Sequence, residues 1–118
     1  MGTRCVITFK DETDTFSIYQ HWDGDPETVF HNLQSVVTAG KAWQGPRFEA
    51  DEFAAAYVAT HKECPGNIRL TKGPRSHGDL SYEYIVYAVG ESLVMKSAEA
   101  FGKRKWRTTT FNFVPVDK

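Results

Sequence analysis

The segment best suited to chemistry is His21–Pro26, which joins a β-rich stretch to a helical pattern. A helix N-terminus offers free amides and the positive end of a dipole, so an anion could bind there. His21 and Asp23 could form a general-base pair or contribute metal ligands. A structural interpretation is available for the same residues: Trp22 buried in the corner, the next two residues forming the turn, and Asp25 capping the helix. We favour the structural interpretation and keep His21, Trp22 and Asp23 as a candidate functional corner.

The densest run of positive charge is Lys103-Arg104-Lys105-Trp106-Arg107. Four basic side chains around an indole could contact phosphates and stack a base. Arg75 would extend this surface if the loop at residues 73–78 folds toward it. A charged turn between strands is also a common way to keep a sheet edge soluble and unpaired. The sequence leaves partner binding and a solvated turn both open.

Metal and cofactor signatures are weak. His61 and Cys64 form an isolated His-x-x-Cys, whereas a structural zinc site needs four ligands, usually in two close pairs. Cys5 lies in a different predicted element. Cys–His catalysis would need Cys5 or Cys64 beside a histidine and an oxyanion donor, a proximity that the sequence does not establish. The glycines at 73 and 78 lack the strand–loop–helix context of a phosphate loop. We therefore expect no metal, no cofactor and no catalytic residue that can be named, with both cysteines as reduced thiols.

Local patterns predict two helices and several strands. Strands are expected at 3–10 and 15–22, joined as a hairpin by a polar turn. A helix should begin after Asp25, with Pro26 at its first position, and end near Gly40. Its apolar face follows helical spacing and consists of Val29, Phe30, Leu33, Val36 and Val37.

The second half continues with a helix from residue 48 or 49 to just before Pro65. Further strands are expected at 67–72, 82–89, 93–96 and 106–114, the 82–89 strand central and the last one Thr-rich and at an edge. The expected fold is α+β: an antiparallel sheet of about five to six strands with two helices on one face, in the order ββααββββ. Residues 1–118 should form a single domain.

Composition narrows the functional classes. A net charge of −1 argues against a general polyanion binder, whose affinity comes mainly from neutralised phosphates. No stretch approaches the roughly 20 apolar residues of a membrane span, and no signal-peptide pattern opens the chain. We expect a cytoplasmic protein with no membrane partner. It should be a monomer, or a homodimer paired through the Thr-rich strand.

Three segments carry a resemblance to a known group: Thr3-Arg4, the run from Ile18 to Glu27, and the Tyr82–Ile85 strand. The chain resembles small phage and mobile-element proteins that begin Ser-Thr-Arg and carry a Tyr-x-His-Trp-Asp-Gly-Tyr-Pro-Glu motif. The resemblance covers about the first forty residues, with Asp25 in place of the motif's second tyrosine. It implies a bacteriophage or prophage accessory protein in a bacterial host cell. It supplies no activity to carry over.

These observations favour a binding protein over an enzyme. The leading hypothesis is a non-enzymatic phage accessory protein that binds and inhibits a host defence component, such as a CRISPR effector complex. Its partner would be a host protein or nucleoprotein complex, contacted through the acidic turn at residues 11–14 or the basic turn at 103–107. The alternatives are a nucleic-acid-binding module that uses the basic turn, and a small enzyme with a site near His21 and Asp23.

Overall fold

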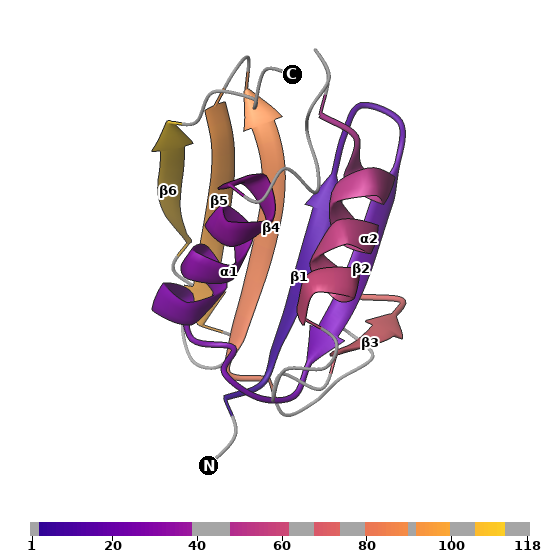
Figure 1. The fold of residues 1–118 in the computed structure, drawn as a ribbon. Helices are drawn as coiled ribbons and strands as arrows, with labels where there is room; N and C mark the ends of the chain where they lie inside the picture. The colour runs from indigo at the N-terminus through magenta and orange to yellow at the C-terminus, as the bar shows by residue number, and fades with distance from the viewer. Residues whose placement is uncertain are drawn as a thin grey trace.

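The protein is described by a computed structural model that covers residues 3–38, 48–61, 68–73, 80–89, 92–99 and 106–112, with side chains in the last segment up to residue 108. Its elements follow the expected order ββααββββ (Figure 1). They are β1 (Cys5–Lys10), β2 (Thr15–Gln20), α1 (Pro26–Thr38), α2 (Ala50–His61), β3 (Ile68–Thr71), β4 (Tyr82–Val89), β5 (Ser92–Glu99) and β6 (Arg107–Asn112). The α+β class predicted from the sequence is confirmed.

The six strands form one sheet in the order β3-β2-β1-β4-β5-β6. Neighbouring strands are antiparallel except β1 and β4, which run parallel with Ile7 opposite Tyr84. The expectation of a wholly antiparallel sheet is wrong for this pair. No hairpin links these two strands, because both helices and two strands lie between them in the chain. The long crossover allows β4 to enter the sheet from the same end as β1. The predicted central position of β4 and edge position of β6 are confirmed.

Both helices cover the same face of the sheet, with α1 over the β4–β5 half and α2 over β1 and β2 (Figure 1). The predicted apolar face of α1 is confirmed, since Val29, Leu33, Val36 and Val37 are buried and Phe30 packs against them. The second helix begins at Ala50, slightly later than expected. Its predicted end falls at residues 62–67, outside the described part of the chain.

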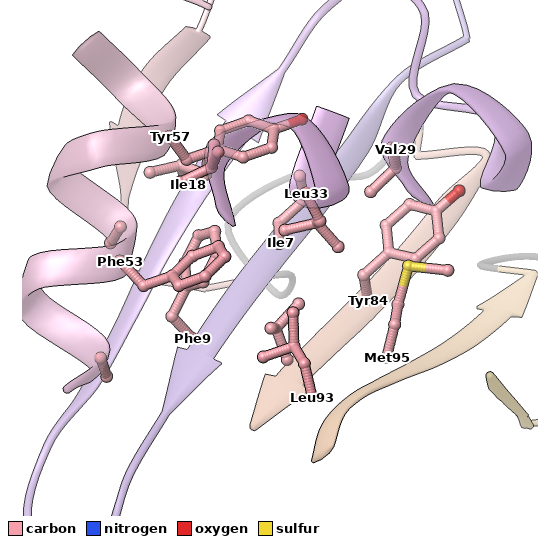
Figure 2. Close-up of a cluster of buried hydrophobic side chains, with 14 of the residues drawn as sticks. Ile7, Phe9, Ile18, Val29, Leu33, Phe53, Tyr57, Tyr84, Leu93 and Met95 are labelled. Carbon is pink, nitrogen blue, oxygen red and sulfur yellow. The ribbon is translucent and has the colours of Figure 1, made fainter. Parts of the chain in front are cut away.

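The core lies between the helices and the sheet (Figure 2). The ring of Phe9 on β1 packs against Phe53 and Tyr57 on α2, with centroids 5.7 and 5.9 Å apart. Tyr84 and Met95 carry the same core under α1. Each such side chain contributes about 1.5–3 kcal/mol by leaving water, so this layer supplies most of the folding free energy.

Among the described elements, no helix covers the opposite face of the sheet (Figure 1). Strand alternation turns Val6, Thr8 and Lys10 toward it while their neighbours enter the core. Among the described residues a small cluster of Val6, Tyr19 and Leu80 covers one end of this face. None of the described helices is long and apolar enough to span a membrane.

Candidate functional site

The corner at His21–Pro26 is built around a glycine that tolerates no side chain. The Gly24 amide donates to the carbonyl oxygen of Thr3 at 2.8 Å, which ties the corner to the start of β1. A Cβ on Gly24 would lie 2.7 Å from that oxygen and 2.8 Å from Cys5 Sγ. On the other side, the buried hydroxyl of Tyr84 donates to the Gly24 carbonyl oxygen at 2.6 Å. Gly24 is therefore held by the segment that leads into β1 and by β4, and its close approach to Thr3 and Cys5 explains why a glycine is needed.

A buried amide holds the two residues before Gly24. Gln20 is 1% exposed, and its Nε2 donates to the carbonyl oxygens of Trp22 and Asp23 at 2.9 and 3.0 Å. Its Oε1 accepts from the hydroxyl of Tyr57 on α2 at 2.8 Å. Because Gln20 is buried and its bond to Tyr57 is buried too, the chain direction after β2 is fixed by a polar network that reaches into the core.

Asp25 caps α1 as the sequence predicts. Its carboxylate accepts from the backbone amide of Thr28 at 3.1 Å and from the Thr28 hydroxyl at 3.0 Å. Asp23 adopts a left-handed backbone conformation, with φ of 57°, which Asp and Asn tolerate better than most residues. The turn and cap roles assigned to these residues are confirmed.

Two aromatic side chains remain on the surface of this corner. His21 Nδ1 lies 2.7 Å from the hydroxyl of Tyr19. The indole of Trp22 meets the His21 ring edge-on with centroids 4.5 Å apart, and it is 40% exposed. The expected burial of Trp22 is wrong: Gln20 fills the inward position two residues earlier, and β2 ends there.

His21 and Asp23 are not paired at this corner. The hydrogen-bond partner found for His21 is Tyr19 and not Asp23, so the hypothetical general-base pair does not form in this geometry. Within the described residues no group of three or more His, Cys, Asp or Glu side chains is placed to hold a metal ion. Burial raises the pKa of the Cys5 thiol far above its usual value, with the Asp25 charge adding to the effect, so its reactive thiolate is disfavoured.

Two acidic clusters that are distant in sequence, at residues 11–14 and 49–52, meet where the β1–β2 turn reaches the start of α2. Asp11 Oδ2 accepts from the Ala50 amide at 2.8 Å, so the β1–β2 turn caps the start of α2. Its Oδ1 also accepts from the amides of Thr13 and Asp14. These backbone bonds, that from Ala50 above all, lower the pKa of Asp11 to about 2.

The contact between α1 and α2 contains a second histidine. His61 Nε2 lies 3.2 Å from the Asn32 carbonyl oxygen and 3.4 Å from Ser35 Oγ. Partial burial lowers the pKa of His61, while the Asn32 carbonyl opposes that effect. A role in packing the helices accounts for these contacts.

The predicted basic surface is only partly visible. Trp106 is 42% exposed and Arg107 is exposed at the start of β6. Lys103, Arg104, Lys105 and Arg75 lie outside the described residues, as does Cys64. The predicted continuous basic surface therefore stays a prediction from the sequence.

Sequence patterns did not reveal the supports of the corner. Tyr57 and Tyr84 act through contacts that join residues far apart in the chain, whereas Tyr19 contacts His21 only two residues away. One signal was present for Gln20: a polar residue at a position where strand alternation points toward the core. Such a residue must find partners, and here it holds the turn.

Comparison with protein-family models, curated proteins and solved structures finds no match to this chain. The resemblance to phage and mobile-element proteins thus stays a prediction from the sequence motif.

Proposed function

We propose that this chain is a non-enzymatic accessory protein of a bacteriophage or related mobile element. It acts in the cytoplasm of the bacterial host, where it binds and inhibits a defence component by protein–protein contact, in the manner of an anti-CRISPR protein. The motif resemblance supports the genomic setting. The surface of the corner supports the mode of action.

The observation that carries the proposal is the presentation of Trp22. Tryptophan is strongly enriched among the residues that dominate binding energy at protein interfaces. Its ring here is 40% exposed, braced by His21, while Gln20 fixes its backbone carbonyl from below. A side chain held in place before binding loses less conformational entropy when a partner covers it. The corner therefore suits an anchor for another protein.

The test compares Trp22→Ala with Trp106→Ala, because the two indoles are almost equally exposed, at 40% and 42%. Phage plating efficiency is measured on hosts with and without an active defence system, each expressing wild type or one variant. Wild type and Trp106→Ala should protect the phage in the defence-proficient host. Trp22→Ala should not. Affinity capture with the same three proteins then identifies a partner that Trp22→Ala fails to retain.

Two results would count against this proposal. If wild type gives no protection against any tested defence system, inhibition is the wrong activity. If Trp106→Ala abolishes protection and Trp22→Ala does not, the contact lies at the 103–107 turn instead of the corner. Thermal unfolding of both variants is measured alongside, so that loss of protection is not confused with loss of fold.

A further inference from the structure

The helix-free face of the sheet has a polar centre. Cross-strand register places one row of side chains across its middle, running from β6 to β3. The row consists of Thr108, Lys96, Ile85, Thr8, Ser17 and Thr71. Four of these residues carry hydroxyls, and Thr8 Oγ1 lies 2.9 Å from Ser17 Oγ. The row therefore offers hydrogen-bonding groups where a protein interface would centre on apolar side chains.

An aromatic ring lies beside this row. Tyr87 follows Ile85 on the same face of β4 and is partly exposed. Lys96 Nζ lies 5.7 Å from the Tyr87 ring centroid, which pairs a cation with the ring. An aromatic face next to an ammonium group is the combination that binds a base together with its phosphate.

The helix-free face of the sheet exposes more positive than negative charge. The charged residues that the described registers place on the helix-free face are Lys10, Arg69, Lys96 and Glu83. Three are cations, while the single carboxylate, Glu83, is 4% exposed. The exposed acidic side chains of the described residues lie elsewhere: in the β1–β2 turn, at the corner, on or just before the helices, and at the end of β5 on the helix-covered side. They are Glu12, Asp14, Asp23, Glu27, Glu49, Asp51, Glu52 and Glu99. The accessible charge on the helix-free face is complementary to a polyanion.

Single strands fit this face better than duplexes. Sheets bind single-stranded nucleic acid by stacking splayed bases on aromatic side chains, whereas paired bases hide their faces. Three cations are few for a duplex, whose affinity depends mainly on neutralised phosphates. A stacking ring with a small number of cations also agrees with a chain whose net charge is −1.

We propose that the open part of this face binds single-stranded nucleic acid. This platform comprises Thr8, Lys10, Ile85, Tyr87, Lys96 and Thr108. One base stacks on Tyr87, Lys96 and Lys10 contact phosphates, and the threonine hydroxyls bond to bases or sugars. The proposal goes beyond the contact at Trp22 and does not depend on it. With both surfaces, this chain could bind the protein part of a nucleoprotein complex through the corner and the exposed nucleic-acid strand of that complex through the platform.

The test uses fluorescence anisotropy of labelled oligothymidylate and oligouridylate of about 12 nucleotides, with a duplex of the same length as a third probe. Tyr87→Leu should weaken single-strand binding by about 5- to 150-fold, the range for one base stacked on one ring. Tyr87→Phe keeps the ring and should retain affinity. Lys96→Gln should weaken binding and reduce the slope of log affinity against log salt by about 0.7.

Arg107→Gln is the matched control for Lys96→Gln. It removes the same charge from an exposed residue, but its register partner is Ser97, on the helix-covered side. With two phosphate contacts the wild-type salt slope should be about −1.4, whereas the four cations of the 103–107 turn would give about −2.8. A slope near −2.8, with a larger loss of affinity for Arg107→Gln than for Lys96→Gln, would overturn the proposal in favour of the turn.

Other results would also overturn it. One is that neither oligonucleotide binds, and another is that the duplex binds as tightly as the single strands. A third is that oligonucleotides do not bind but a captured protein partner is lost in Tyr87→Leu. Circular dichroism checks that each variant folds, and Lys96→Gln keeps the test decisive if Tyr87→Leu does not fold. Trp22→Ala should leave oligonucleotide affinity unchanged, so the two proposals can fail separately.

Discussion

The two faces of the sheet are made from the same strands but carry different side chains. On the helix-covered face, Ile7, Phe9 and Tyr84 are almost fully buried against α1 and α2. On the other face, Thr8 and Tyr87 alternate with them and remain partly exposed. The helix-covered face holds the larger buried cluster. The other face also buries Val6, Val94 and Ala98, but its partly exposed polar and aromatic side chains can serve binding. The corner at Gly24 belongs with the first face, because its contacts with Thr3 and Tyr84 are buried.

The largest effect is expected where the corner meets the core. Gly24→Ala should lower the free energy of unfolding by about 3 kcal/mol, because its new methyl group would overlap the Thr3 carbonyl and Cys5. Urea unfolding measures the change. Asp23→Gly is the adjacent control: it removes an exposed side chain at a positive φ and should be neutral or slightly stabilising. A Gly24→Ala protein as stable as wild type would show that the corner is not packed in this way.

A smaller loss of stability is expected when Gln20, whose side-chain amide supports the corner, is replaced. Gln20→Leu should cost about 2 kcal/mol, since it leaves the carbonyl oxygens of Trp22 and Asp23 without their buried donor. Tyr57→Phe removes one bond of the same network and should cost about 1 kcal/mol. Urea unfolding of both single variants and the double variant gives the coupling free energy between Gln20 and Tyr57. Strictly additive losses would contradict a shared network.

Acid should weaken the link between the β1–β2 turn and α2. The pKa of Asp11 is about 2 in the folded protein, against roughly 3.9 in an unfolded chain. The depressed value means that its stabilising effect is present above pH 4 or so and is lost as pH falls toward 2. Asp11→Ala should therefore lower the melting temperature at pH 6 and reduce its further fall between about pH 4 and pH 2. Glu12→Gln, an exposed neighbour, is the control, and identical pH profiles for all three proteins would exclude the Asp11 contact.

The smallest effect on stability is expected on the helix-free face. Lys96→Gln should change the free energy of unfolding by no more than about 0.5 kcal/mol, because the side chain is partly exposed and contacts the Tyr87 ring from the surface. Thermal unfolding measures it. A loss as large as that of Gln20→Leu would mean that this face also holds the fold together, and the contrast between the two faces would fail.

Short-range patterns predicted much of the fold. The Asp25 cap and the apolar face of α1 depend on residues within a few turns of one another, so local spacing is enough to find them. The His21–Pro26 segment was identified as a corner for the same reason, because its turn and cap residues are neighbours in the sequence. Its outward-facing Trp22 was missed, because burial depends on which neighbouring side chain fills the space, and here that side chain is Gln20.

The sequence alone determined the element order, the capped first helix, the central position of β4 and the turn at Asp23 and Gly24. Only the tertiary structure decided that β4 lies parallel to β1, that Asp11 meets Ala50, and that Gln20 joins Tyr57 to the backbone of Trp22. The pairing of β1 with β4 and the contacts of Asp11 with Ala50 and of Gln20 with Tyr57 each join residues dozens of positions apart in the chain. Local propensity carries no information about such pairs, because their free energy exists only once the whole core has closed around them.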